Sequence, residues 1–266
     1  MAKKDGRQLA RENETRVLRA LHRFGWLRTR DLSSLCWRRW AAKPSGPPEF
    51  GPTAPTESAM RMAQRTLRRL RDGRLVIRAQ APDDSIVYGL SEGGARRLKE
   101  SGVAAISSKD LVRSFSSAYY RHRCIANEVA ISGIVQGYRA TTEREIAQGT
   151  WLGGEAGIEG KRPDALLRDR NRVWWVEVEK SRKNKKDYSA LLAWLDKVKL
   201  DRQRPDSARL LGQGNVWAKV VFICSAAFQA KLLLDLEAAG WEKSCMDDLI
   251  LCISDLYSFE DIVFAR

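Results

Sequence analysis

Histidine and cysteine are scarce in this chain of 266 residues. The two histidines are His22 and His122, and the five cysteines are widely spread and never form a CxxC pair. This scarcity argues against zinc-protease sites, Ser-His-Asp triads, CxxC zinc modules and a disulfide-stapled fold. An odd number of scattered cysteines indicates a reducing compartment, and we expect the protein in the cytoplasm.

Long apolar runs are also absent from the sequence. No stretch approaches about 18 uncharged apolar residues, so we expect no transmembrane helix and no membrane partner. The basic N-terminus lacks the apolar run that follows it in a secretory signal. Hydrophobic residues make up 44% of the chain and charged residues 30%, which is typical of a globular protein.

The net charge of +14 is concentrated in the first part of the chain. Residues 1–110 contain 23 Lys and Arg against 12 Asp and Glu, whereas residues 111–266 contain 24 against 21. A strongly basic part joined to a nearly neutral part indicates a polyanion-binding module attached to a second module. We therefore predict two domains, 1–110 and 111–266.

The first domain has the pattern of three helices followed by a β-hairpin. Apolar spacing and turn residues predict its elements at 14–25, from near Thr29, at 57–72, at 75–79 and at 86–90. Five of the eight prolines lie between the second and third helices, so we expect a disordered-like loop over 43–56. The local patterns Arg65–Val76 and Val87–Gly94 resemble the winged helix-turn-helix family.

The third predicted helix has one apolar stripe and an otherwise cationic surface. Ala63, Leu67 and Leu70 form the stripe, and seven arginines occur between positions 61 and 78 against one acid, Asp72. A recognition helix needs an apolar face to seat it and a cationic face to meet DNA in the major groove. The alternative is a winged helix that contacts proteins, with arginines that only solubilise it. The DNA-binding candidates are Arg61, Arg65, Arg68, Arg69 and Arg71.

The second domain mixes helices and strands. Periodicity predicts helices at 113–136, 187–202 and 227–239, and strands at 138–146, 162–167, 172–179, 219–224 and 249–253. Apolar strands between helices predict a mixed sheet covered on both faces, and hence an α+β fold class for the whole chain. Trp174 and Trp175 are expected on opposite faces of their strand.

Three carboxylates are expected to gather in this second domain. Glu177 and Glu179 project to the same face of one strand, and Asp164 lies where the neighbouring strand begins. Three carboxylates side by side repel each other unless a cation lies between them, and hard oxygen ligands suit Mg²⁺ or Mn²⁺. Such a metal activates water and neutralises charge at phosphorus. We predict Asp164, Glu177 and Glu179 as both metal ligands and catalytic residues.

The Pro-Asp…Glu-x-Glu arrangement resembles the PD-(D/E)XK nuclease superfamily, which has a restriction-endonuclease-like α/β core. Together with the winged helix, His122 and Glu128 on the preceding helix, and the stretches Lys161–Ala165 and Val176–Ser181, it resembles the replication-relaxation family. That family includes MobC-type mobilisation relaxases, which nick plasmid DNA at a transfer origin. The resemblance covers roughly residues 14–255.

One position departs from the superfamily pattern. The lysine expected two residues after an acid is replaced by Glu179, and Lys180 follows one position later. Lys161, Lys183 and Lys186 are the other candidates for the missing cation. Accessory acids could come from Glu128, Glu143 and Glu145, although the plainer interpretation is that these are solvated surface residues.

These features predict a metal-dependent DNA-nicking relaxase or endonuclease that acts in plasmid mobilisation or replication. The alternative is a non-catalytic winged-helix DNA-binding regulator or relaxosome accessory protein with a degenerate nuclease fold. The expected partner is double-stranded DNA. Association with relaxosome or coupling proteins, and a homodimer, are left open.

Overall fold

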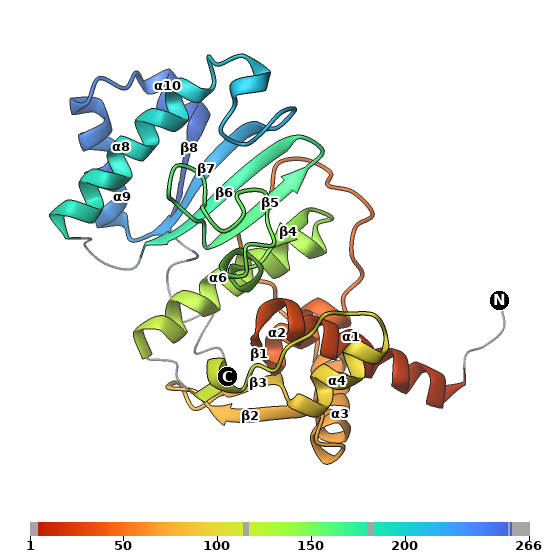
Figure 1. Ribbon diagram of the computed structural model, residues 1–266. Coiled ribbons are helices and arrows are strands. Elements are labelled where there is room, and N and C mark those ends of the chain that lie inside the picture. Colours follow the sequence, from red (N-terminus) through yellow and green to blue (C-terminus); the bar gives the residue numbers. More distant parts are fainter. Residues whose placement is uncertain (1–4, 114–116, 180–183, 255, 257–266) are drawn as a thin grey trace. The chain divides into compact units, whose positions relative to one another are not determined.

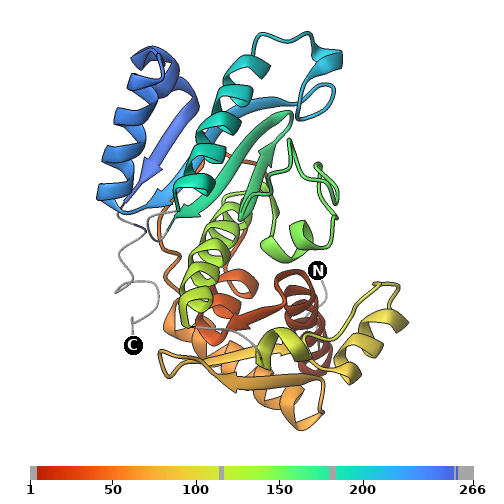
Figure 2. The ribbon, with the colours of Figure 1, turned by 60° about the vertical axis from the view of Figure 1, so that its left-hand side comes forward.

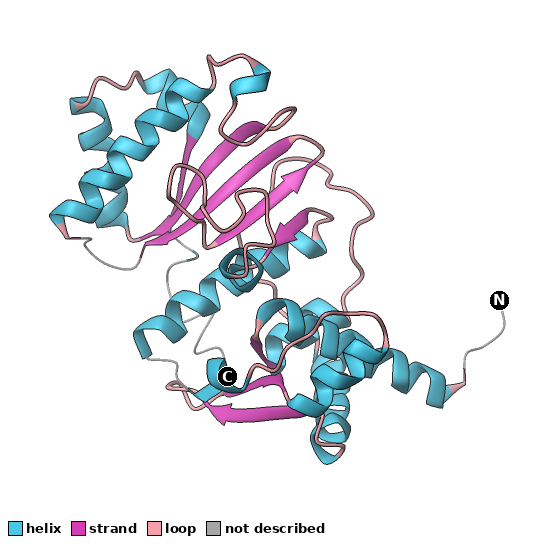
Figure 3. Ribbon diagram, in the orientation of Figure 1, coloured by secondary structure: helices cyan, strands magenta, loops and turns pink. Residues whose placement is uncertain are grey.

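The computed structural model describes residues 5–113, 117–179, 184–254 and 256 (Figure 1). It contains helices and two sheets, so the chain is α+β (Figure 3). Two compact units are present: the first combines Met1–Trp40 with Thr53–Arg123, and the second combines Ala41–Pro52 with Cys124–Arg266. The boundary that the sequence placed near residue 110 therefore falls at Arg123, inside a helix.

The first unit is a set of helices around a three-stranded antiparallel sheet. Its strand order is β1-β3-β2, and β2 and β3 form a hairpin. The elements in chain order are α1 (Gly6–Phe24), β1 (Trp26–Arg28), α2 (Thr29–Cys36), α3 (Glu57–Asp72), β2 (Val76–Gln80), β3 (Ile86–Leu90), α4 (Glu92–Glu100) and α5 (Lys109–Arg113).

Helix α3 has the bounds that the sequence predicts, because both of its ends carry local signals. The Thr56 side chain caps the first turn by accepting a hydrogen bond from Ala59 N, and the helix ends at Gly73. The stripe of Ala63, Leu67 and Leu70 is buried, which seats the helix on the core of the first unit.

Strand β1 and the first turns of helix α1 were not predicted from the sequence. Strand β1 has only three residues, and it pairs with β3 through partners such as Leu27 and Tyr88. Helix α1 begins at Gly6, well before the predicted start at residue 14, and Asp5 caps it by accepting from Arg7 N. The early turns of α1 carry mostly polar residues, so apolar spacing could not reveal them.

The proline-rich segment has no helix or strand between Trp37 and Thr56, as its composition indicates. It nevertheless has a defined course along the second unit. Ala41 N donates to Val135 O, and Gln136 both accepts from Glu49 N and donates to Glu49 O. Gly137, at φ +91°, lets the backbone of the segment approach closely, since a Cβ there would meet the Lys43 carbonyl group.

The second unit is built on a five-stranded mixed sheet of order β4-β5-β6-β7-β8. The pairs β4–β5 and β5–β6 are antiparallel, and β6–β7 and β7–β8 are parallel. Helix α6 (Ser117–Val135) is shared, because the division between the two units falls at Arg123. The other elements of the second unit are β4 (Arg139–Thr141), α7 (Glu143–Ala147), β5 (Ala165–Asp169), β6 (Arg172–Glu179), α8 (Lys185–Asp201), a 3-10 turn (Asp206–Ala208), β7 (Val216–Cys224), α9 (Ala226–Ala238), α10 (Lys243–Leu249) and β8 (Ile250–Ile253).

The prediction of one strand over residues 138–146 is wrong in its second half. The chain forms the short strand β4 and then the helix α7. Thr142 and Glu145 make a capping box, in which each side chain accepts from the other residue's backbone N–H. Reciprocal capping stabilises a helical turn at that point, and this interaction outweighs the alternating pattern.

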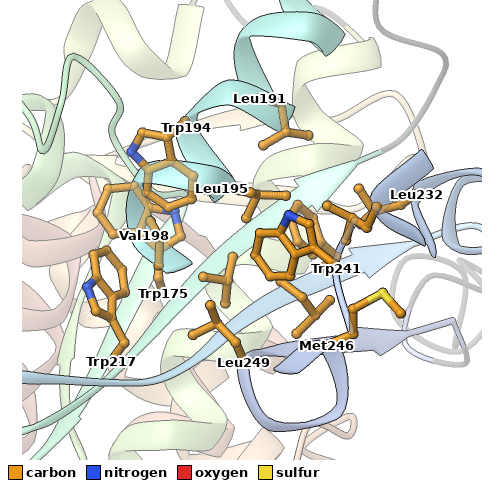
Figure 4. Packing of buried hydrophobic residues seen from close by; sticks show 14 of the residues in the cluster. Trp175, Leu191, Trp194, Leu195, Val198, Trp217, Leu232, Trp241, Met246 and Leu249 are labelled. Atoms are coloured by element: carbon orange, nitrogen blue, oxygen red, sulfur yellow. The ribbon is translucent and has the colours of Figure 1, made fainter. Parts of the chain in front are cut away.

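Helices cover both faces of this sheet (Figure 2). Helix α6 packs on one face, where Gly133 lies so close to Leu167 that a Cβ would overlap that side chain. The other face carries a large apolar cluster with α8, α9 and α10 (Figure 4). Trp174 and Trp175 point to opposite faces as predicted, because Trp174 meets Tyr138 and Trp175 meets Trp194.

The cluster on the α8 face is centred on Trp175. Its ring lies 4.9 Å from that of Trp194 and 5.8 Å from that of Trp217, measured between centroids. The indole N–H groups also have partners: Trp194 donates to Ile158 O at 3.0 Å, and Trp217 donates to Asp201 at 2.8 Å. The predicted carboxylates therefore lie on the sheet face that carries a closely packed, hydrogen-bonded tryptophan layer.

Candidate functional site

Asp164 is positioned by the pairing of β5 with β6. It lies one residue before β5, and its backbone N–H donates to Val176 O at 2.9 Å. Its side chain accepts from Val178 N at 2.7 Å. Because Ala165 is paired with Val176, continuing the antiparallel register places Asp164 opposite Glu177. The two carboxylates therefore neighbour each other on adjacent strands.

Glu177 is the most enclosed acid of the predicted site. Its exposure is 4%, and both carboxylate oxygens have partners. Oε2 accepts from Lys161 Nζ at 2.7 Å, and Oε1 accepts from the indole N–H of Trp175 at 2.5 Å. The carboxylate is thus held between one cation and one neutral donor at the edge of the tryptophan cluster.

Among the lysine candidates that the structure describes, Lys161 contacts a carboxylate of the predicted site, whereas Lys186 is exposed on α8. Lys161 follows the glycine-rich stretch, pairs with Ile158 in an isolated β-bridge, and has Nζ 5.7 Å from the centroid of Trp194. Gly157, at φ +77°, permits the loop to pass close to the Lys161 carbonyl. Of the other lysine candidates, Lys180 and Lys183 lie outside the described residues.

Glu179 lies two residues beyond Glu177 on the same face of β6. Its exposure is 6%, and it is aligned with Cys224 of β7. The negative charge of Glu179 raises the pKa values of both Glu177 and Cys224, although it is not the largest cause at either group. These couplings indicate that Asp164, Glu177 and Glu179 form one electrostatic cluster.

Burial raises the pKa of Glu177 to about 7, with further increases from Asp164 and Glu179. Lys161 acts in the opposite direction, both by its charge and by its hydrogen bond. A carboxyl group with a pKa near neutrality can exchange a proton under physiological conditions, which is the requirement for a general acid or base.

The arginines predicted to bind DNA differ in their surroundings on α3. Arg65 and Arg68 are exposed and make no side-chain ion pair with another described residue. Arg69 pairs with Glu14 of α1 at 3.1 Å, and Glu14 is also bound by Arg97. Two more arginines have exposed acidic partners, namely Arg61 with Glu57 and Arg71 with Asp72.

A family profile described as replication-relaxation matches residues 52–191, which is more than half of the chain. The chain belongs to the replication-relaxation family. Membership indicates a role in plasmid replication or mobilisation. No curated protein and no solved structure matched the chain. The region matched by the replication-relaxation profile includes Lys161, the three predicted carboxylates and all five predicted arginines.

The accessory acids of this replication-relaxation protein lie on the helices α6 and α7. Glu128 is only 2% exposed, so the interpretation of a solvated acid is wrong for it. It lies on α6, which packs on the opposite face of the sheet from Glu177. Glu145 forms the capping box of α7, and Glu143 begins the same helix rather than continuing a strand.

Two further observations concern metal ions and membranes. Among the described residues, no three His, Cys, Asp or Glu side chains are arranged as a metal-binding group. In the same part of the chain, no helix combines the length and the apolar character needed to cross a membrane.

The raised pKa of Glu177 predicts a pH-dependent stability. Folding favours the protonated form, so this contribution is fully present below the pKa of the unfolded chain and is lost as pH rises through about 7. Urea unfolding of wild type and Glu177→Gln at pH 5 and pH 8 measures it. We expect the wild-type free energy of unfolding to fall relative to the variant by roughly 2 kcal/mol. A constant difference between the two proteins would contradict the expected shift.

Proposed function

We propose that this protein binds duplex DNA through its first unit and cuts one strand with the carboxylate cluster of its second unit. The observation that carries the proposal is the arrangement of Asp164, Glu177 and Glu179 on adjacent strands, with the Lys161 ammonium in contact with Glu177. Acids and a cation at one sheet edge are the groups that phosphodiester cleavage requires.

The element order supports a winged helix-turn-helix assignment for the first unit. Helices α1, α2 and α3 precede the β2–β3 hairpin, and β1 joins that hairpin as a third strand. In such modules the third helix enters the major groove while the hairpin lies beside it. The buried stripe of α3 leaves Arg61, Arg65 and Arg68 on the opposite, exposed side of the helix.

The second unit supports a restriction-endonuclease-like assignment. The order α6, β4, β5, β6, α8, β7 corresponds to the αβββαβ core expected from the sequence, with α7 inserted. Asp164 immediately precedes the second strand, and the Glu-x-Glu pair ends the third. These are the positions at which the resemblance places the site.

The chemistry that these residues can perform is hydrolysis at phosphorus. Water adds to the phosphorus atom, a phosphorus–oxygen bond breaks, and the products are a phosphate monoester and a hydroxyl group. Without a bound metal, the pKa of Glu177 is near 7, and its carboxylate can accept the proton of the attacking water. Lys161 places a positive charge beside the carboxylates, where it can offset the charge of the phosphate.

A divalent cation is part of the proposal. The donor chemistry suits Mg²⁺ or Mn²⁺, because carboxylates are hard oxygen ligands and the charges of Asp164 and Glu179 raise the pKa of Glu177. The described side chains are not arranged as a ready-made metal-binding group, so the three carboxylates would have to close around the ion. Asp164, Glu177 and Glu179 would hold the ion. When bound, it would activate water and stabilise charge on phosphorus.

Metal binding should be visible as a thermal shift. We expect Mg²⁺ or Mn²⁺, at about 100 times its Kd, to raise the Tm of the wild type by about 5 °C or more. The Asp164→Asn variant should lose most of this shift, because an amide is a weaker ligand, although its oxygen can still accept from Val178 N. Differential scanning fluorimetry with each metal tests this expectation.

The matched control for this metal test is Glu155→Gln, an exposed acid-to-amide change in the preceding loop. Its metal-dependent shift should equal that of the wild type. Equal shifts in wild type, control and Asp164→Asn would place the metal elsewhere.

A specific observation favours a second candidate function. Both oxygens of Glu177 already have protein partners, as expected for a degenerate site that only stabilises the fold. In that case the protein would be a non-catalytic DNA-binding regulator or relaxosome accessory protein.

The two candidate functions are distinguished by incubating the protein and Mn²⁺ with supercoiled plasmid that carries the native origin. Open-circular product supports nicking, and a gel-shifted but intact plasmid supports the second candidate.

A further inference from the structure

The first unit contains a hollow of about 680 Å³ along α1, on a different surface from the predicted DNA-binding face of α3. One wall is the exposed side of α1, and the other is formed by Leu35 and Cys36 at the end of α2 and by Trp40 beyond it. A smaller hollow of about 250 Å³ shares Cys36 and Trp40 with it and adds Arg38. We call the combined feature the α1 groove.

The charge of the α1 groove is strongly positive. Four arginines of α1 line it and Arg38 lies at its end, whereas Glu12 is the one acid among the lining residues of the described chain. Arg16 is held in place because its guanidinium donates to Cys36 O. The arginines of α1 that line the groove are Arg11, Arg16, Arg19 and Arg23.

Several of these cations have no acidic partner. Arg11, Arg19 and Arg38 are exposed, and their side chains make no hydrogen bond or ion pair with another described residue. Uncompensated charges that converge on one hollow raise the local concentration of anions. The groove therefore suits a polyanion.

Trp40 gives the groove a flat apolar surface. Trp40 is 48% exposed as a residue, which is unusual in a chain whose other tryptophans are largely buried. The ring is fixed by a hydrogen bond of 2.7 Å from its N–H to Leu35 O. Phe24, Leu35 and Ala20 provide further apolar lining beside it.

The α1 groove and the cationic face of α3 are separate surfaces. Glu14 faces α3 and α4, where it pairs with Arg69 and Arg97. Arg19, five residues later, points about 140° away around the helix. A ligand in the groove therefore meets a different side of α1 from the side that packs towards α3.

We propose that the α1 groove binds single-stranded nucleic acid, with a base stacked on Trp40 and phosphates contacted by the arginines. Proteins bind single strands with exposed aromatic rings and nearby cations. The unpaired bases stack on the ring, and the cations contact the phosphates. The bases of a duplex are stacked inside the double helix and cannot reach the ring. An acidic peptide would form ion pairs with the arginines of the groove, but it has no bases to stack on the Trp40 ring and would bind less tightly.

Fluorescence anisotropy of the full-length protein with labelled oligo(dT) and with a duplex of the same length tests this proposal. Trp40→Ala should weaken single-strand binding about tenfold, the loss expected for one stacked base, and should leave duplex binding unchanged. Trp40→Phe should retain most of the affinity, because phenylalanine still offers a π-face. The Arg11→Ala/Arg19→Ala double variant should lower the slope of log K against log salt by about 1.4 for the single strand.

The Arg96→Ala/Lys99→Ala double variant of α4 is the matched control, because it removes two exposed cations of the first unit outside the groove. It should leave oligo(dT) binding unchanged. Unfolding midpoints of all variants show whether each protein is folded. Wild-type affinity of Trp40→Ala for oligo(dT) would overturn the proposal. So would displacement of oligo(dT) by poly-L-glutamate at equal charge concentration, because the groove would then select for charge alone.

Discussion

Asp164→Asn should lower the rate of plasmid nicking by at least about 100-fold, the loss typical of removing a catalytic acid–base or metal-binding group. The substitution keeps an oxygen that can accept from Val178 N, so the strand pairing around it should persist. It removes the negative charge beside Glu177, which contributes to the raised pKa of that group. Densitometry of supercoiled and open-circular plasmid over time measures the effect.

Two controls show whether a loss of nicking reflects a general effect of substitution or a loss of DNA binding. Glu155→Gln, the exposed loop variant, should nick at the wild-type rate, and Asp164→Asn should still shift the mobility of duplex DNA. Full nicking activity in Asp164→Asn would exclude the carboxylate cluster as the catalytic site. If the wild type does not nick but binds duplex, the non-catalytic alternative holds.

The Arg65→Ala/Arg68→Ala double variant should weaken duplex binding about tenfold or more at ~0.1 M salt, and lower the salt slope by about 1.8. Both side chains are exposed on α3 without an acidic partner among the described residues, so their charge is available to phosphates. Titration of a labelled duplex at several salt concentrations gives both quantities.

The DNA affinity of Arg69→Ala, on the same helix, shows which side of α3 contacts the DNA. Its side chain is 43% exposed and paired with Glu14, so we expect a smaller loss of DNA affinity than for the double variant. The surface pair should also cost less than about 1 kcal/mol of stability when broken. If Arg69→Ala weakened duplex binding more than the double variant does, the DNA would contact the Glu14 side of α3 rather than its fully exposed side.

The sequence alone determined the helices and strands whose ends and faces are set by residues within the element itself. Helix α3 and strand β6 have the predicted bounds, because a capping threonine, a terminal glycine and strict alternation are each readable within a few residues. The same alternation placed Glu177 and Glu179 on one face, and Trp174 and Trp175 on opposite faces. Family membership was also readable from the sequence, since it depends on the order of short motifs.

Tertiary structure decided what depends on partners distant in the chain. Lys161 reaches Glu177 only because the glycine-rich loop folds back beside β6, and the sequence left it as one of four lysine candidates. The raised pKa of Glu177 likewise requires burial against Trp175, and strand β1 exists only because β3 lies beside it. Periodicity reports which way a side chain points from its own backbone, whereas desolvation, ion pairing and strand pairing depend on groups that folding brings together from elsewhere.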